Sequence, residues 1–560
     1  MQGWPGMIDR TDRHQSHAVV IIGAGPTGLT LANLLGVYGV SVLLVERNHT
    51  TVQEPRAVSI DDESLRTMQA AGLSERVLEH VVAGYGSKYL SPSGRCFLEV
   101  APTETKYGYP RRNAFRQPIF EAQLREGLGR FASVETRFGT RFQAFRQNKQ
   151  GVHVDLVSAD GGTSRVHCAY LVGCDGAGSA VRGTLGVVLQ GRTFEEKWLI
   201  VDLEESPSPH RDTIVFCDSR RPCIALPGPN LTRRFEFKLR DGENPETMCS
   251  DAVVAHLLAE HGAAPSSTVR RKTVYTFHAR LAPTWAVGRV FLAGDACHLT
   301  PPFAGQGMNS GIRDAHNLSW KIAAVVQERL GPGLLESYQR ERMNHVGEMI
   351  ELALRMGRIM GPKSRVRGAM TRLAFRCLNV WPPARSYFAE MKYKPEPRIT
   401  DGFLVPDGAG ARHTLVGRLI PQPVAQDDNG VALPLDAELG DGFSLLAFID
   451  DPARFAAETS QWIWQQLGVR RILITTSGAH STSAVTVLTV PREQLVGANS
   501  RVKDLVLLLR PDRYVAAAFP LAEVEDFAVR VASLCAATRE SGADATLGHA
   551  DANTQLRGFP

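Results

Sequence analysis

The sequence contains no apolar run long enough to cross a membrane. Its most apolar stretches, around residues 18–45 and 503–509, are interrupted by glycine, proline or charge before the roughly 18 residues that a spanning helix needs. The first 17 residues are polar, carry two arginines and two histidines, and lack the apolar segment of a secretory signal peptide. We therefore expect a cytoplasmic protein with no membrane partner.

The sequence also lacks paired cysteines and a large excess of charge of one sign. The nine cysteines are scattered, without a CxxC pair, which is typical of reduced thiols and predicts no metal site. Lys and Arg (63) barely exceed Asp and Glu (58), and no long basic run occurs, so a nucleic-acid partner is not expected. A chain of 560 residues is too long for one ordinary core, so two or three domains are expected.

The chain opens with a strand-helix-strand pattern. Residues 17–22 (HAVVII) are a short apolar run that ends at glycine, which is typical of a buried parallel strand. Residues 26–37 have helical spacing, and residues 40–45 (VSVLLV) form a second apolar run. This unit predicts a Rossmann-like α/β domain at the start of the chain.

A glycine-rich turn, GAGPTG, joins the first strand to the helix. Gly23 permits the tight turn, Gly25 lets the backbone approach a pyrophosphate, and Gly28 lets helix and strand pack closely. Glu46 follows Gly28 by 18 residues, at the end of the second strand, where a carboxylate accepts ribose hydroxyls. The pattern predicts dinucleotide binding but does not choose between NAD and FAD, and a glycine-rich turn without a ligand is the simpler alternative.

A second motif follows an apolar strand at residues 290–293. Gly294 is followed by Asp295, which at a strand end can bind a ribityl hydroxyl. The next turn can present backbone N–H groups to an isoalloxazine ring, and its members include Pro301, Gly305, Gly307 and Met308. Such a turn alone is ordinary, but its place about 270 residues after the first motif favours FAD. Nearby, His298 is either a polar flavin contact or a hydrogen-bonded turn histidine.

A third motif, LVGCDGAGSAVR at residues 171–182, places Asp175 in an Asp-Gly turn after a buried strand, with Ser179 opening a helix. The three motifs together resemble the class A flavoprotein monooxygenases. In that family the Asp-Gly motif serves FAD and the nicotinamide cofactor, and there is no separate nicotinamide domain. The single GxGxxG of this sequence agrees with that arrangement.

Three segments narrow the resemblance. Residues 54–73, 107–118 and 505–517 look like those of the 3-(3-hydroxyphenyl)propionate hydroxylases. These enzymes use FAD, O₂ and NADH, with NADPH as the alternative, to convert 3-(3-hydroxyphenyl)propionate and 3-hydroxycinnamate to catechols. The resemblance therefore implies a small phenolic substrate that bears a carboxylate. The flavin contacts that it implies are Glu46, Arg47, Arg56, Gln117 and Asp175.

The resemblance and the element pattern together imply three units. Residues 1–190 and 286–395 are expected to form the FAD-binding domain, interleaved with an antiparallel substrate-binding sheet at residues 191–285. Residues 411–535 match the thioredoxin-like domain of the phenol hydroxylase branch, and their single cysteine leaves a structural or homodimer-forming role. Residues 536–560 are expected to be a disordered tail. Other expected elements are helices at 64–71, 314–327 and 334–360, strands at 170–173, 198–203, 234–239, 443–449, 471–475 and 505–509, and linkers at 382–383 and 394–410.

The chemistry requires a base for the substrate phenol and a cation for its carboxylate. Tyr275, in VYTFHARL, lies where the phenol hydroxylase branch contributes a tyrosine, and His278 is the second candidate base. A tyrosine in a sheet with its hydroxyl at the rim is the simpler alternative for Tyr275. The candidate partners for the carboxylate are Arg112, Arg221 and Arg234, which the sequence does not rank.

Other functions fit the same motifs. A related flavin monooxygenase could act on another phenol or on a polyketide, and a flavin dehydrogenase or reductase would not activate oxygen. A non-catalytic FAD-binding redox sensor is the third alternative, which the missing CxxC and the intact turn at residues 294–311 disfavour.

Overall fold

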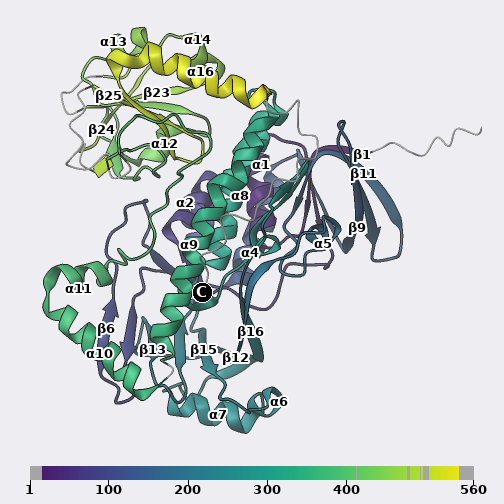
Figure 1. Cartoon of the computed structure of the whole chain (residues 1–560), viewed down its shortest axis with the longest axis vertical. Coiled ribbons are helices and arrows are strands. Elements are labelled where there is room, and N and C mark those ends of the chain that lie inside the picture. The colour runs from purple at the N-terminus through teal and green to yellow at the C-terminus, as the bar shows by residue number, and fades with distance from the viewer. Residues whose placement is uncertain are drawn as a thin grey trace, which may run out of the picture.

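The computed structural model describes residues 15–362, 364–410, 413–475, 480–491, 494–495 and 504–540. These residues form three large sheets with helices around them (Figure 1). In the view of Figure 1 the C-terminal domain lies at the top, the sheet that contains β1 and β11 at the right and the mostly antiparallel sheet at the bottom. The predicted α/β class, with an interleaved antiparallel sheet and a thioredoxin-like C-terminal domain, is confirmed.

The first sheet is built on the strand-helix-strand unit predicted at the start of the chain. β1 (Gln15–Ile22) pairs in parallel with both β2 (Val42–Glu46) and β11 (Thr163–Gly173). Val19, Val20 and Ile21 are fully buried, as expected for a strand covered on both faces. The remaining strands are β8 (Val134–Phe138), β9 (Thr140–Gln147), β10 (Val152–Ser158), β17 (Ala286–Val287) and β18 (Val290–Leu292).

The second sheet lies over the flavin motifs and is mostly antiparallel. Its order is β19-β16-β12-β15-β14-β13-β5-β6. The bounds are β19 (His298–Leu299), β16 (Thr268–Leu281), β12 (Gln190–Glu204), β15 (Arg233–Lys238), β14 (Cys223–Pro227), β13 (Thr213–Phe216), β5 (Ser87–Leu90) and β6 (Cys96–Val100). The sheet thus extends beyond the expected 191–285, because β5 joins it by parallel pairing with β13. A separate, small three-stranded sheet contains β3 (Ser59–Asp61), β7 (Arg112–Phe115) and β4 (Val81–Ala83).

The C-terminal domain has a thioredoxin-like core. β22 (Ser444–Ala447) and β23 (Arg470–Thr475) pair in parallel, and β25 (Leu505–Leu509) with β26 (Val515–Pro520) forms an antiparallel pair beside β22. α16 (Val524–Glu540) then closes the domain. The other strands and helices are β20 (Val424–Gln426), β21 (Ala432–Pro434), β24 (Thr486–Thr489), α12 (Leu435–Leu439), α13 (Pro452–Glu458) and α14 (Trp462–Gln466).

The helices differ from the expectations at three places. α8 (Gly307–Val326) begins seven residues before the predicted 314, because the glycine-rich turn leads directly into it. The proline pair expected as a linker is the first turn of α11 (Pro382–Ala389), where proline is tolerated. Residues 536–540, expected in the tail, belong to α16 instead, and the rest of the expected tail, residues 541–560, lies outside the described part. The other helices include α1 (Pro26–Val37), α2 (Asp62–Ala70), α3 (Ser74–Leu78), α4 (Gln117–Gly127), α5 (Ala180–Thr184), α6 (Pro245–Met248), α7 (Asp251–Glu260), α9 (Ser337–Met360) and α10 (Arg365–Val380).

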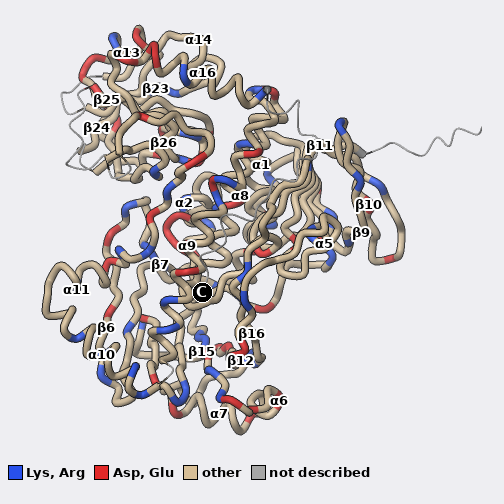
Figure 2. Tube along the Cα trace, viewed as in Figure 1, with Lys and Arg blue, Asp and Glu red and all other residues tan. Residues whose placement is uncertain are grey.

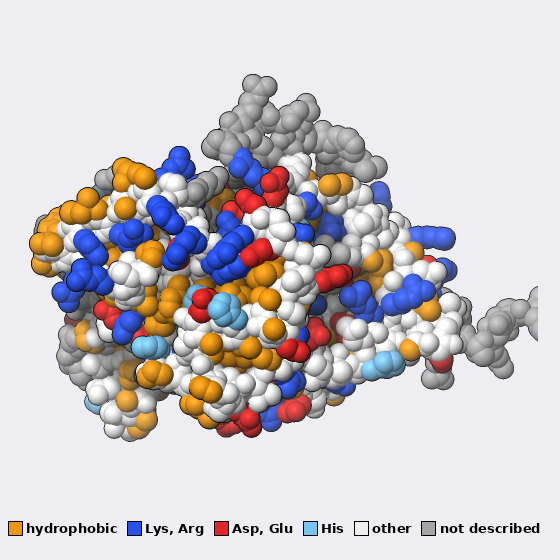
Figure 3. All heavy atoms as spheres, turned by 90° about the horizontal axis from the view of Figure 1, so that it is seen from below, with side chains coloured by type: hydrophobic (Ala, Val, Ile, Leu, Met, Phe, Trp, Pro, Cys, Tyr) orange, Lys and Arg blue, Asp and Glu red, His pale blue; other side chains and the backbone are white. Residues whose placement is uncertain are grey.

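Charge and apolar surface are distributed as in a globular protein. Basic and acidic residues are interspersed along the trace (Figure 2). Among the described helices, none is both long and apolar enough to cross a membrane. α10 is unusual because it exposes Val366, Met370 and Leu373 beside its arginines, on the end of the molecule seen in Figure 3.

Candidate active site

A cavity of about 970 Å³ runs from the GAGPTG turn to the antiparallel sheet. Its wall brings together segments that are far apart in the sequence: the β1–α1 turn, the end of β2, residues 50–59, the Asp-Gly turn before α5, and residues 299–308. The other side of the cavity is formed by β13, β14, β15 and β16 and by the end of α9. All three predicted flavin motifs therefore meet at one cavity.

Close backbone contacts exclude a side chain at two glycines of the first motif. A Cβ on Gly28 would lie 1.9 Å from the carbonyl oxygen of Gly23, and one on Gly23 would lie 2.4 Å from that of Cys174. Gly25 has open space around it and lines the cavity, just before the N-terminus of α1. Glu46 also lines the cavity and accepts a hydrogen bond from Ala24 N at 2.8 Å. An anionic pyrophosphate would thus meet a helix N-terminus, with a carboxylate placed for the ribose.

The second motif presents a carboxylate with no protein partner. Gly294 has φ +61°, and a Cβ there would lie 2.5 Å from Thr27 Oγ1, so the turn requires glycine. Asp295 lines the cavity and forms no hydrogen bond or ion pair with any described residue. Desolvation raises its pKa, and the charges of His298 and Arg56 oppose that effect. A cavity-facing acceptor that is exposed and has no partner among the described residues fits a ligand hydroxyl.

The side chain of Asn309 holds the turn after Asp295 in shape. Asn309 donates through Nδ2 to Gly305 O at 2.6 Å and to Ser59 O at 3.1 Å. Gly305 has φ +63°, and Gly305, Gly307 and Met308 all line the cavity at the start of α8. Pro301 lies outside the lining, although its neighbours Thr300 and Pro302 belong to it.

The remaining predicted flavin contacts divide into cavity-facing and supporting residues. Arg47 and Arg56 line the cavity. Gln117 also lines the cavity, and it accepts hydrogen bonds from Arg56 N at 2.9 Å and from Ala57 N at 2.7 Å, so its side chain positions that loop. Asp175 lines the cavity, but its Oδ2 caps α5 by accepting from Ala180 N at 2.7 Å. The convergence of the three motifs on one cavity, the α1 N-terminus and the unpartnered Asp295 together fit FAD.

Comparison with known proteins agrees with this fit. A family model described as "FAD binding domain" matches residues 16–353, and one described as "HcaD C-terminal domain" matches residues 417–534. The 3-(3-hydroxy-phenyl)propionate/3-hydroxycinnamic acid hydroxylase of Escherichia coli O139:H28 is 38% identical over 510 residues, which cover 90% of this chain and 92% of that protein. The chain belongs to the class A FAD-dependent aromatic monooxygenases. FAD is therefore its cofactor, and NAD(P)H is the co-substrate typical of the class.

Other relatives and solved structures agree. The hydroxylase of the same description from Klebsiella pneumoniae (strain 342) is 38% identical over 516 residues, covering 89% of this chain and 91% of that one. The flavin-dependent monooxygenase PieE, in complex with FAD and substrate, has a TM-score of 0.75 at 22% identity, over 93% of this chain and 99% of that chain. The anhydrotetracycline hydroxylase OxyS from Streptomyces rimosus has a TM-score of 0.71 at 27% identity, covering 92% of this chain and 99% of that one. Membership of a monooxygenase family disfavours the two alternatives of a flavin reductase and a non-catalytic FAD-binding sensor.

Of the two predicted bases, His278 lines the cavity and Tyr275 does not. Tyr275 is outside the cavity lining, and its hydroxyl hydrogen-bonds Arg271. His278 lines the cavity but is partly exposed, with Nδ1 3.1 Å from Thr193 Oγ1. Desolvation and the charge of Arg280 lower the pKa of His278. His298 is fully buried and 2.7 Å from Asp314, which favours the turn-histidine interpretation.

The structure separates the three candidate arginines. Arg221 pairs with Glu243 and lies outside the lining. Arg234 lines the cavity, but its N–H groups bind Asp202 and the carbonyls of residues 55 and 56. Arg112 lines the cavity and donates to Ser87 Oγ and to Tyr85 Oη, the latter at 3.2 Å. Arg112 alone of the three remains available to a carboxylate.

Sequence reasoning missed Glu236, which also lines the cavity. It stands in RRFEFK of β15, where Phe235 and Phe237 pack against the core beside α7 and the alternate residues face the other way. Charged residues at alternate positions of a strand otherwise buried were the signal that could have found it.

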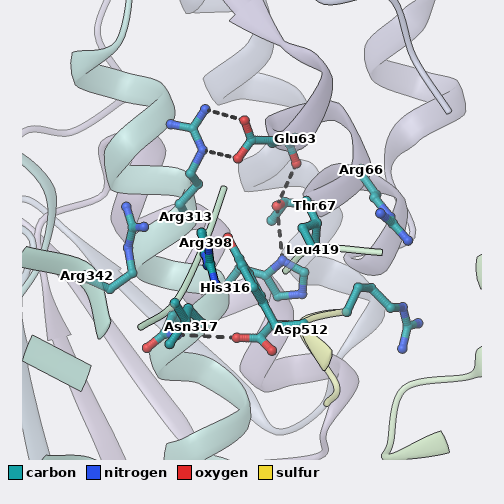
Figure 4. A pocket seen from close by; sticks show the side chains of 13 residues that line it. Glu63, Arg66, Thr67, Arg313, His316, Asn317, Arg342, Arg398, Leu419 and Asp512 are labelled. Atoms are coloured by element: carbon teal, nitrogen blue, oxygen red, sulfur yellow. Dashed lines mark hydrogen bonds and ion pairs between the residues drawn. The ribbon is translucent and has the colours of Figure 1, made fainter. Parts of the chain in front are cut away.

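The contact between the FAD-binding part and the C-terminal domain contains a second, much smaller cavity of about 30 Å³ (Figure 4). Around it, Glu63 pairs with Arg313 at 2.7 Å, and Asn317 donates to Asp512 at 3.3 Å. The acidic cluster at residues 61–63 is neutralised by Arg313 together with Lys394. A polar cavity of this size has room for about one or two water molecules, and not for a substrate.

Proposed function

We propose that this monooxygenase hydroxylates 3-(3-hydroxyphenyl)propionate, and also 3-hydroxycinnamate, at the ring carbon ortho to the phenol. The reaction consumes one NADH, one O₂ and one proton, and yields the 2,3-dihydroxy product, NAD⁺ and water. The printed names of the Escherichia coli and Klebsiella relatives support this substrate. The structural observation that carries the proposal is Arg112, a cavity-facing cation that pairs with no carboxylate among the described residues.

Arg112 is held in place by neutral groups. Its guanidinium lies 4.5 Å from the centre of the Tyr85 ring, and Ser87 and Tyr85 take two of its hydrogen bonds. A cation inside a cavity costs desolvation energy unless a counter-ion arrives. A substrate carboxylate supplies that counter-ion and can bind guanidinium in a bidentate manner.

The size and lining of the cavity favour a one-ring substrate. Single ligand sites range from roughly 300 to 1,000 Å³, whereas about 970 Å³ here must hold FAD and substrate together. The remaining wall is largely apolar or aromatic, with Phe303, Leu352, Met356 and Tyr89 among its members. When bound, FAD supplies the redox chemistry, accepting hydride from NADH and activating O₂. The apolar wall excludes the water that would divert the oxidising equivalents to peroxide.

Turnover of a matched pair of phenols tests the proposal. With 3-(3-hydroxyphenyl)propionate, the wild-type protein should couple NADH oxidation to formation of the dihydroxy product. Mass spectrometry identifies that product. Arg112→Met should raise the KM for this acid roughly tenfold to hundredfold, because one charge-assisted interaction contributes about 1.5–3 kcal/mol. Its KM for 3-ethylphenol, which lacks the carboxylate, should change little.

Arg220→Met is the matched control, because Arg220 is exposed and lies outside the cavity lining. It should leave both KM values unchanged. Equal effects of Arg112→Met on the acid and on 3-ethylphenol would remove Arg112 as the carboxylate partner. Efficient coupled turnover of 3-ethylphenol by the wild type would instead indicate a general phenol hydroxylase.

The homodimer that the sequence left open stays a prediction. The exposed apolar side chains of α10 are the surface at which we would first test it (Figure 3). Light scattering of the wild type and of Leu373→Glu measures the mass in solution. A twofold mass that falls in the variant would place the interface there.

A further inference from the structure

The proposed reaction needs a group that takes the phenol proton, and neither sequence-predicted base is well placed. Removing that proton raises the electron density of the ring at the carbon ortho to the oxygen. Tyr275 lies outside the cavity and His278 lies in its partly exposed wall. An acceptor that is buried in the cavity and accepts no hydrogen bond from a described residue would meet the requirement.

Glu236 has that environment. Its side chain is on β15, between the cross-strand neighbours Ile224 of β14 and Ile200 of β12. It is only 6% exposed, lines the cavity, and makes no hydrogen bond to any described residue. The nearest cation is Arg234, with Nη1 4.0 Å from Oε1, and that guanidinium is already bound to Asp202 and to two backbone carbonyls.

A structural role does not explain this carboxylate. Burying a carboxylate costs several kcal/mol when its one cation lies 4.0 Å away and is shared with Asp202. A residue kept only for packing would be apolar, as Phe235 and Phe237 are on the other face. A group that meets a ligand in the cavity would offset this cost when the ligand is bound.

Glu236 and Arg112 line the same cavity over one face of the sheet. Glu236 pairs with Ile224 of β14, Ile224 with Val215 of β13, and Val215 with Tyr89 of β5. Ser87, which accepts a hydrogen bond from Arg112, lies two residues from Tyr89 on β5. The backbones of β5 and β15 are three strand spacings apart, roughly 14 Å, so a one-ring acid lying across β13 and β14 would have Arg112 at one end and Glu236 at the other.

We propose that Glu236 accepts the phenol proton of the substrate while Arg112 holds its carboxylate, an inference that rests on the proposed function. The O–H bond breaks, the proton moves to the Glu236 carboxylate, and the electron pair stays on the phenolate oxygen. After oxygen transfer the ring loses the hydrogen of the attacked carbon and regains its aromaticity. The carboxyl then returns its proton to the product or to solvent, so the overall balance is unchanged.

The electrostatics of the site agree with this role. Burial raises the pKa of Glu236 to about 7, while Arg234 lowers it and Asp202 raises it further. Arg234 on β15 and Asp202 on β12 are the charged groups that face it, and β14 contributes Ile224 and Leu226. A base with a pKa near the working pH is deprotonated in a large share of molecules and still binds a proton well.

The test compares FAD-loaded wild type with Glu236→Gln, which keeps the shape of the side chain. The variant should lower kcat roughly 10²- to 10⁴-fold with a KM within about threefold of the wild type. The limb of the wild-type kcat/KM profile that rises near pH 7 should disappear. Glu236→Asp should recover part of the rate, and the exposed Glu246→Gln should behave as the wild type.

A readout independent of turnover uses 3-(3-hydroxy-4-nitrophenyl)propionate, whose phenolate absorbs visible light. The pH midpoint at which the bound probe ionises should depend on the Glu236 carboxylate. It should therefore differ between the wild type and Glu236→Gln. An unchanged pH profile and an unchanged probe titration in that variant would overturn the assignment. Wild-type protein that neither binds nor hydroxylates the acid would refute the proposed function itself, whereas coupled wild-type turnover with an indifferent Glu236→Gln would refute only this inference.

Discussion

Asp295 and Asp314 belong to the same motif region, and removing each carboxylate should change a different property of the protein. Asp295 faces the FAD cavity with no partner among the described residues. Asp314 is fully buried and holds His298 at 2.7 Å, Arg342 at 2.9 Å and Gly294 N at 3.1 Å. We therefore predict that Asp295→Ala weakens FAD binding without loss of fold, and that Asp314→Ala destabilises the fold.

The magnitudes follow from these contacts. Losing one charge-assisted hydrogen bond to the ribityl chain costs about 1.5–3 kcal/mol, which raises the FAD Kd roughly tenfold to hundredfold. Asp295 is exposed to the cavity and makes no hydrogen bond or ion pair with a described residue, so the apoprotein of Asp295→Ala should melt close to the wild-type temperature. Asp314→Ala leaves Arg342 buried and unpaired, at a cost of about 3–5 kcal/mol.

The assay titrates FAD into apoprotein and follows quenching of flavin fluorescence, with thermal melting of each apoprotein measured in parallel. An Asp295→Ala protein with wild-type FAD affinity would show that the second motif does not contact the cofactor. A lower melting temperature for that apoprotein would show that Asp295 supports the fold, contrary to its lack of partners.

Three further predictions concern the domain contact and the substrate. Glu341→Gln should lower the melting temperature at an unchanged FAD Kd, because it breaks the buried pair with Arg510 (2.7 Å) at a cost of about 3–5 kcal/mol; no change in melting would contradict this. Asp436, held by Arg66, has a pKa lowered to about 2, so it should contribute about 2 kcal/mol above pH 5 that is lost as the pH falls towards 2. Acid unfolding curves of wild type and Asp436→Asn measure this, and parallel curves would refute it. With simple phenol in place of the acid, the enzyme should oxidise NADH and release peroxide, because phenol leaves Arg112 unpaired. Coupled hydroxylation of phenol at a kcat/KM comparable to that of 3-(3-hydroxyphenyl)propionate would refute the substrate assignment.

The flavin motifs were predictable because their physics is local. The bounds of α1 agree with the expected residues 26–37, since glycine spacing, Pro26 and helical periodicity all lie within one short segment. Gly23 and Gly28 follow the same rule, because the contacts that exclude a Cβ there come from the turn itself and from Cys174 beside it. Boundaries failed where packing decided them, as at α8, whose first turn is held by Asn309 against Ser59, about 250 residues away in the sequence.

By itself, the sequence therefore determined the individual FAD motifs, because each depends on the order and spacing of residues within one short segment, and the resemblance that these motifs carry implied the fold class and the kind of reaction. Only the tertiary structure decided which charged side chains share the cavity. Arg112, Arg221 and Arg234 are equivalent as residues in a sequence, and they differ because Glu243 and Asp202 occupy two of them while Arg112 keeps neutral neighbours. Glu236 became a candidate base for the same reason. Its neighbours come from other strands of the sheet, and strand pairing over long sequence distances sets whether a charge meets a partner or a cavity.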